Sequence, residues 1–169
     1  MKIKALILVL FVVLLGCGKG SNVNVVLNGV LSNCPANFTC TYNYYDHAGV
    51  QQNHLGPGAS REFSYTAVDS TVCNDTRQLY FDFALSSDEF DIKAPQIAAG
   101  QAVYFESCPC CNFAFNPEAI GGEIKGKRTD ANHWLINATI VIGDDNNKPA
   151  DTLIVNQTFT LKTLPVNGP

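Results

Sequence analysis

Alternation of apolar and polar side chains recurs along this chain and limits its possible folds more than any other feature of the sequence. Successive side chains of a β-strand point to opposite faces of a sheet, so this alternation is typical of strands with one buried face. The pattern is clear in residues 38–44, 63–67 and 79–85. Val23–Leu31 and Gln101–Glu106 alternate less regularly but are rich in β-branched or aromatic residues, so strands are predicted there too.

The last third of the chain carries the most regular version of this pattern. Three strands are predicted, at Glu123–Arg128, His133–Ile142 and Thr152–Leu164, and the segments between them are rich in Asp and Asn. Short polar connections of this kind join antiparallel neighbours, so we expect a meander. Its middle strand has one apolar face, formed by Trp134, Ile136, Ala138, Ile140 and Ile142.

The arrangement of these segments predicts the fold class. No segment after the first 16 residues keeps a helical period for three turns, and residues 116–119 form at most one short turn. We therefore predict a single all-β domain over residues 23–169, with little helix outside the N-terminal signal. An antiparallel β-sandwich is the expected architecture and a small β-barrel is the alternative. Residues 46–59 are predicted to form a long connection between aromatic strands.

The N-terminus has the composition of an export signal. Lys2 and Lys4 precede an unbroken run of 11 apolar residues, Ala5 to Leu15. As a helix this run would span only about 16 Å, whereas the hydrocarbon layer of a membrane is about 30 Å thick. We therefore expect residues 1–16 to act as a signal peptide and not as a permanent membrane span.

The end of this signal has a recognisable sequence. Leu14-Leu15-Gly16-Cys17 resembles the lipobox of bacterial envelope lipoproteins. The resemblance implies cleavage before Cys17, lipidation of its thiol and a flexible tether over residues 17–22. Gly18 stands where an aspartate would imply retention at the inner membrane, so the resemblance implies the outer membrane. The alternative is a secreted protein whose signal is cut after Gly18.

The charge of the chain argues against one class of partner. Its 11 basic and 15 acidic residues give a formal net charge of −4. A net-negative protein without a long run of Lys or Arg repels phosphate groups. We therefore expect no nucleic-acid partner, and a membrane contact through the lipid anchor only.

Six cysteines remain besides Cys17, and an even number in an exported protein favours disulfides. Six cysteines allow 15 complete pairings. A Cys110–Cys111 bridge is disfavoured because adjacent Cα atoms lie only about 3.8 Å apart. We expect these two residues to use different partners, with Cys73 and one of the first two cysteines as candidates. The disulfide candidates are Cys34, Cys40, Cys73, Cys108, Cys110 and Cys111.

The segment 108–111 also supports two other hypotheses, metal binding and redox exchange. The sulfurs of Cys108, Cys110 and Cys111 could bind zinc or copper, with His47, His54 or His133 completing the shell. Cys108 and Cys111 also form a Cys-x-x-Cys pair, which suits redox exchange. A second pair at metal-ligand spacing and a βαβ setting are both missing, so disulfides and no cofactor are the preferred prediction.

Polar and aromatic side chains gather in and before the predicted long connection. Rings beside amides and imidazoles suit stacking on, and hydrogen bonding to, a sugar or peptide. The candidate ligand-binding residues are Tyr44, Tyr45, His47, Gln52 and His54.

Sequence motifs of catalysis are missing. The chain has no Gly-x-Ser-x-Gly elbow, no His-Glu-x-x-His and no phosphate-binding loop. The leading hypothesis is therefore a lipid-anchored binding or structural module of the cell envelope without catalysis, with an unidentified protein, peptide or glycan ligand. The alternatives are a metal-binding envelope protein that uses Cys108–Cys111, and a secreted hydrolase with paired carboxylates.

Overall fold

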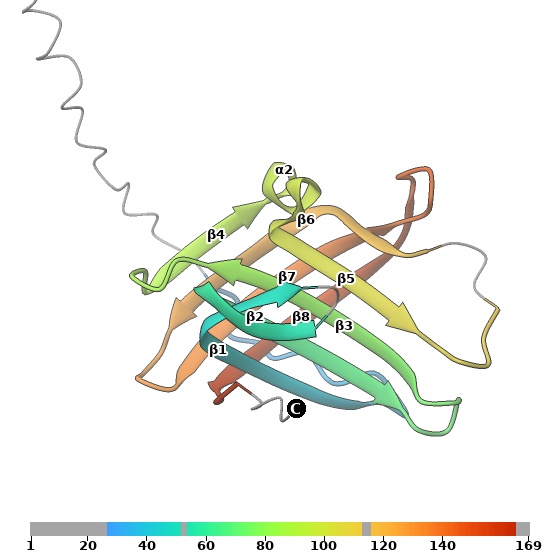
Figure 1. Ribbon diagram of the computed structural model, residues 1–169, viewed down its shortest axis with the longest axis horizontal. Coiled ribbons are helices and arrows are strands. Elements are labelled where there is room, and N and C mark those ends of the chain that lie inside the picture. The colour runs from blue at the N-terminus through green and yellow to red at the C-terminus, as the bar shows by residue number, and fades with distance from the viewer. Residues whose placement is uncertain (1–26, 52–53, 113–115, 165–169) are drawn as a thin grey trace, which may run out of the picture.

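The computed structural model describes residues 27–51, 54–112 and 116–164 (Figure 1). The predicted signal, Cys17 and the tether lie outside these residues. No helix among the described residues is long and apolar enough to cross a membrane. The strands are β1 (Thr39–Gln51), β2 (His54–Asp69), β3 (Asp75–Phe83), β4 (Glu89–Lys93), β5 (Ala102–Ser107), β6 (Glu118–Arg128), β7 (His133–Gly143) and β8 (Pro149–Leu161).

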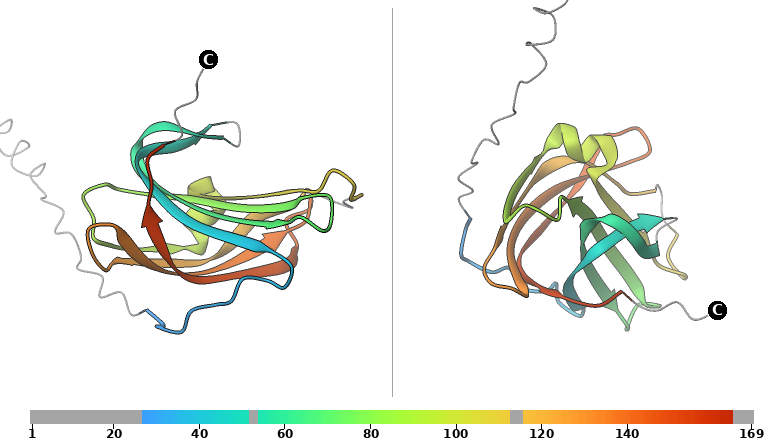
Figure 2. Two further views of the ribbon diagram at one scale, coloured as in Figure 1. Left: turned by 90° about the horizontal axis from the view of Figure 1, so that it is seen from below. Right: turned by 60° about the vertical axis from the view of Figure 1, so that its left-hand side comes forward.

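All eight strands belong to one sheet with the order β4-β6-β7-β8-β1-β2-β3-β5. The predicted all-β class is confirmed. Pairing is antiparallel within each group of four strands, and a short parallel contact between β1 and β8 joins the two groups. The groups lie one over the other as two layers (Figure 2, left). The two layers are arranged as in the predicted sandwich. They differ from two separate sheets because the β1–β8 pairing makes them parts of one sheet.

The inner faces of the two layers enclose an aromatic core. Phe63 on β2 is fully buried and contacts rings from five other strands, with centroids 5.0–5.9 Å away: Tyr44, Phe81, Phe90, Trp134 and Phe159. These distances are typical of favourable offset and edge-to-face aromatic pairs. Phe63 therefore connects both layers at the centre of the molecule.

The sheet is not closed into a barrel, because its edge strands β4 and β5 are not paired with each other. A short helical segment connects them, made of α2 (Ala94–Gln96) and a single wide turn, η1 (Ile97–Gln101). Ile97 of η1 is buried in the core. Gly100 has φ +92°, a backbone conformation that glycine adopts without strain, and it ends the turn before β5.

The predicted meander is confirmed. Strands β6, β7 and β8 are consecutive antiparallel neighbours. The predicted apolar face of β7 is buried throughout, from Trp134 to Ile142. This agreement reflects the regular alternation in the middle strand, where every second residue is apolar.

Three segments differ from the sequence prediction. Residues 27–31 are not in a strand; this part of the chain runs beside β8, where the Ser32 amide donates to the Asn156 carbonyl oxygen at 2.8 Å. Glu89–Lys93 is not among the predicted strands and is strand β4, because Phe90 and Ile92 are buried between its acidic residues. The long connection predicted over 46–59 is also wrong, because β1 and β2 continue through most of it as a paired hairpin.

This extension of β1 and β2, residues 48–51 and 54–60, is here called the hairpin arm. Ala48 pairs with both Pro57 and Ser60, and this irregular register bends the strands. A Cβ atom on Gly58 would lie 2.3 Å from the Ala48 carbonyl oxygen, so only glycine fits there. The arm rises from the sheet and turns back over it (Figure 2, left). Its glycines gave it the composition of a loop, whereas backbone pairing makes it a hairpin.

Candidate functional site

The hairpin arm covers a cavity of about 440 Å³ on the outer face of β2, β3 and β5. The walls come from the arm, including Ala48, Gln51 and Pro57, and the opposite side comes from Val103 and Phe105 of β5. A volume of this size is ordinary for a small-molecule site. The cavity exists because the arm bends at the irregular pairing of Ala48.

Two carboxyl groups line this cavity. Glu62 on β2 and Asp82 on β3 are direct partners in the antiparallel register. Their neighbours Phe63 and Phe81 point into the core, so alternation directs Glu62 and Asp82 to the outer face. Directly opposed side chains have Cβ atoms about 4.5–5.5 Å apart, which brings the two acids together.

Glu62 is the unusual member of this pair because it is only 3% exposed. Among the described residues none donates a hydrogen bond to its carboxyl group. Burial, assisted by repulsion from Asp82, raises the pKa of the Glu62 carboxyl to about 8. At neutral pH this group is therefore a neutral carboxylic acid, which can both donate and accept a hydrogen bond.

Aromatic rings surround the carboxyl pair. Tyr80 and Phe105 line the cavity, with ring centroids 6.2 Å apart, and Tyr45 of β1 is the register partner of Glu62. Burial raises the pKa of the Tyr80 hydroxyl, so this group also stays neutral. The same two rings line a neighbouring cavity of about 520 Å³, which His54 and Glu106 border. The outer face thus carries two adjoining hollows that share one aromatic wall.

The structure separates the predicted ligand-binding residues. Tyr44 is 1% exposed, and its hydroxyl donates to the Ala131 carbonyl oxygen at 3.3 Å, so it belongs to the core and not to an open site. Tyr45 lies on the outer face beside Glu62, and His54 borders the second cavity. His47 is exposed at the bend of β1, with φ +58°. Gln52 lies outside the described residues.

The arginine next to Glu62 faces the opposite way. Arg61 is 4% exposed and its Nε and Nη2 donate to the two carboxylate oxygens of Asp46 at 2.6 and 3.1 Å. Its guanidinium carbon lies 5.0 Å from the centroid of the Trp134 ring. Such a two-point pair over an aromatic face fixes the arginine at the margin of the core. Arg61 therefore does not neutralise the carboxyl groups of the cavity.

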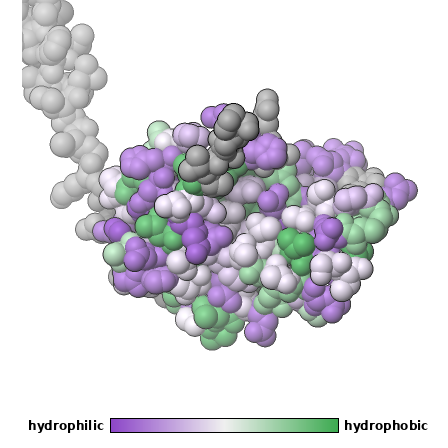
Figure 3. Space-filling view, turned by 60° about the horizontal axis from the view of Figure 1, so that its bottom comes forward, coloured by the Kyte–Doolittle hydropathy of each residue, from purple (hydrophilic) through white to green (hydrophobic). Residues whose placement is uncertain are grey.

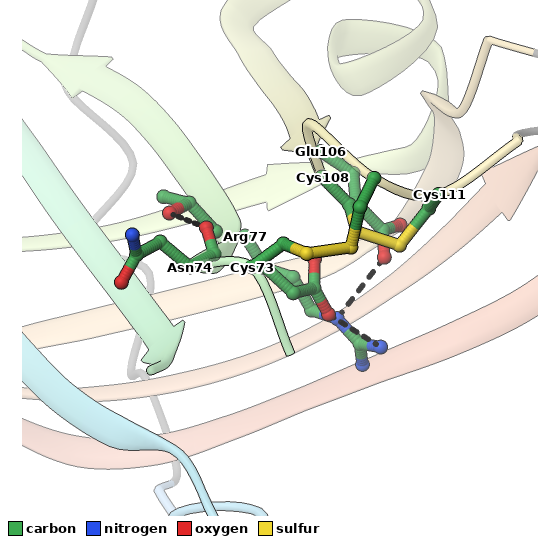
Figure 4. Close-up of a disulfide and its surroundings, with 9 residues drawn as sticks. Cys73, Asn74, Arg77, Glu106, Cys108 and Cys111 are labelled. Atoms are coloured by element: carbon green, nitrogen blue, oxygen red, sulfur yellow. Dashed lines mark hydrogen bonds and ion pairs between the residues drawn. A yellow bond between two sulfur atoms is a disulfide. The ribbon is translucent and has the colours of Figure 1, made fainter. Parts of the chain in front are cut away.

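The second candidate site is a cluster of cysteines near the far end of β3 and β5. Cys73 lies in the turn between β2 and β3, and Cys108–Cys111 follows β5, which pairs with β3. The Sγ atoms of Cys108, Cys110 and Cys111 all lie within 4.8 Å of one another. Figure 4 shows Cys73, Cys108 and Cys111 together, above the Arg77–Glu106 ion pair.

These cysteines form disulfides in the structure: Cys34–Cys40, Cys73–Cys110 and Cys108–Cys111. Cys110 and Cys111 use different partners, as expected, and Cys73 is one of them. The expected use of Cys34 or Cys40 as the other is wrong. A turn at residues 35–38 reverses the chain, with the Phe38 amide donating to the Pro35 carbonyl oxygen at 3.1 Å, and places Cys34 beside Cys40.

The sequence patterns did not identify Glu62 or Asp82 as candidate site residues. Both occupy polar positions of strands whose alternate residues are buried, so alternation alone assigns them to solvent. The signal that finds them is tertiary, because the hairpin arm covers the polar face of β2 and β3. The acidic groups at Asp88–Asp91 and Asp144–Asp145 lie elsewhere, and none of these residues lines the cavity.

Comparisons of the chain with protein-family models, with curated proteins and with solved structures found no match.

The hydropathy of the surface gives separate evidence about protein partners. On the face shown in Figure 3, hydrophobic residues among those coloured by hydropathy lie scattered between hydrophilic ones. Large continuous apolar patches are typical of protein interfaces, so this face has the character of ordinary solvated surface.

Proposed function

We propose that this protein is a non-catalytic binding module of a bacterial envelope, and that the cavity under the hairpin arm is its binding site. The observation that carries the proposal is Glu62, a buried carboxyl group that faces a cavity without a donor among the described residues. Burying a carboxyl group is costly, and groups whose pKa is strongly shifted by burial concentrate at functional sites. A bound ligand would supply hydrogen bonds or an opposite charge to this carboxyl group.

Filling the cavity tests this site. In Val103→Trp a large ring replaces a half-buried side chain of the cavity wall, so ligand binding is expected to be lost. Isothermal titration calorimetry on the full-length protein in detergent, with a panel of sugars, short peptides and small amines, provides the measurement. The matched control is Ile154→Trp, at a position 55% exposed on β8, which is expected to bind like the wild type. Equal binding by both variants would place the site elsewhere.

The proposed location rests on the lipobox-like sequence and on the disulfide pairs. Disulfides are typical of exported proteins, and two or more acyl chains give stable membrane attachment. Cells given radiolabelled fatty acid are expected to label the wild-type protein and not a Cys17→Ser variant. The variant is expected in the soluble fraction, and the wild type in the outer-membrane fraction. Equal labelling of the two proteins would remove the anchor from the proposal.

A metal site is the second candidate function, and the clustering of sulfur atoms favours it. With Cys73 added to Cys108, Cys110 and Cys111, four sulfurs are available, which is the number that a structural zinc site uses. Sequence reasoning did not include Cys73 among the metal ligands. This candidate requires the four cysteines to be reduced thiolates, whereas the binding-module proposal expects disulfides.

The carboxyl pair also supplies what the hydrolase alternative requires, namely two acids lining one cavity. Retaining glycosidases hold their carboxyl groups about 5–5.5 Å apart, with one acid protonated. The module proposal expects no turnover of chromogenic glycosides or esters. Turnover that Glu62→Gln abolishes would replace binding by hydrolysis as the function of this cavity.

A further inference from the structure

The charge of the cavity points to one class of ligand, and this inference rests on the proposed function of the cavity. Glu62 and Asp82 are the acidic residues among those lining it, and they are partners in the β2–β3 register. Among the described residues that line it there is no lysine, arginine or histidine. An anionic ligand would find no positive partner there, whereas a cation would be attracted by a carboxylate and would favour ionisation of Glu62 as well.

The basic side chains nearest in sequence and register are held by other partners. Arg61 is paired with Asp46 on the core side of β2. Arg77 on β3 forms two ion pairs. Its Nε lies 3.2 Å from Oε1 of Glu106, and its Nη2 lies 3.6 Å from Oδ2 of Asp75. The carboxyl pair therefore has no counter-ion among the described residues that line the cavity.

The aromatic wall suits the same class of ligand. Tyr80 and Phe105 line the cavity beside the two acids. The face of an aromatic ring attracts a cation, and the attraction grows when the cation is removed from water. Rings together with carboxylates favour an organic ammonium group, which has apolar substituents, over a bare metal ion that prefers oxygen ligands alone.

We infer that the cavity binds a small organic amine as its ammonium ion, held between Glu62 and Asp82 and against the rings of Tyr80 and Phe105. Binding of the cation favours the ionised form of Glu62. The carboxylic acid therefore releases one proton to the solvent when the ammonium ion enters, and the complex retains two carboxylates and one positive charge.

Proton release makes the affinity depend on pH in a defined direction. The titratable groups that face Glu62 are Tyr45 from β1 and Asp82 and Tyr80 from β3; the arm and β5 contribute none among the described lining residues. Because the pKa of the Glu62 carboxyl is raised to about 8, its ionised fraction grows as the pH rises toward that value. Affinity for an amine is then expected to increase about 50-fold from pH 6 to pH 8.

Isothermal titration calorimetry on the full-length protein in detergent tests the inference with four probes. Butylammonium and choline carry the charge, 1-butanol is the neutral isostere, and butyrate is the anion. We expect binding of the two cations only. Butylammonium titrations at pH 7 in two buffers of different ionisation enthalpy are expected to show release of about one proton.

The variants are Glu62→Gln and Asp82→Asn, with Glu89→Gln on β4 as the matched surface control. Each cavity variant is expected to weaken butylammonium binding about 10- to 100-fold, and Glu62→Gln is expected to abolish the pH dependence and the proton release. The control is expected to behave like the wild type. Thermal unfolding of each variant verifies that it is folded, and Asp82→Asn provides the result if Glu62→Gln does not fold.

The outcomes separate this inference from the proposed function. Binding of 1-butanol as tight as that of butylammonium, or affinity that does not rise with pH, would overturn the amine class. A sugar or peptide bound in the cavity instead, with loss in Val103→Trp, would also overturn it and leave the binding module intact. No binding of any probe or panel compound would overturn both.

Discussion

Replacing Phe63 by alanine is expected to lower the free energy of unfolding by about 3–5 kcal/mol. Phe63 is fully buried and its ring contacts rings of β1, β3, β4, β7 and β8. The variant loses the transfer free energy of the ring and leaves a void between two layers that other aromatic side chains already hold in place. Phe63 therefore joins β2 to five other strands through one side chain.

Urea unfolding provides the measurement, because the single tryptophan, Trp134, lies 5.4 Å from the Phe63 ring and reports on this part of the core. Ile154→Ala on the exposed side of β8 is the control and is expected to change stability by no more than about 0.5 kcal/mol. A loss below about 1 kcal/mol in Phe63→Ala would mean that the two layers do not share this core.

Removing the Cys73–Cys110 bridge is expected to cost about 4 kcal/mol of stability in the double variant Cys73→Ser/Cys110→Ser. The bridge closes a loop with a sequence separation of 37, the longest of the three, whereas the separation for Cys34–Cys40 is 6. Because the entropy removed from the unfolded chain grows with loop length, Cys34→Ser/Cys40→Ser is expected to cost only about 2 kcal/mol. Urea unfolding of both variants under non-reducing conditions gives the comparison.

Intact mass distinguishes this result from the metal alternative. Three disulfides remove six hydrogens from the mass of the reduced chain, and the six cysteines that form them then offer no thiolate to a metal. Free thiols with one zinc or copper ion per chain, and unfolding induced by a chelator, would instead assign Cys73 and Cys108–Cys111 to a metal site.

The two faces of β2 explain how one strand serves stability and binding together. Arg61 and Phe63 point to the core side, where ion pairing and aromatic packing hold the layers. Glu62 points to the opposite side and is buried by the hairpin arm. The binding proposal can therefore be tested on Glu62 and Asp82 while the core remains intact, and the core can be tested on Phe63 without changing a residue that lines the cavity.

The amino-acid sequence predicted the all-β class, the meander of β6, β7 and β8, and the buried face of β7. These features follow from alternation along a strand, which is a local property set by the two-residue repeat of the backbone. It also indicated that Cys110 and Cys111 have different partners, because adjacent residues cannot easily span a disulfide.

The sequence did not predict three features: the joining of the two layers into one sheet, the partner of Cys34 and the burial of Glu62. Each depends on which distant segments become neighbours: β1 beside β8, a chain reversal at residues 35–38, and an arm that bends at Ala48 over a polar face. Alternation assigns a side chain to one face of a sheet, but it carries no information about what later covers that face. A polar residue such as Glu62 therefore has the sequence signature of solvent exposure and the environment of a binding site.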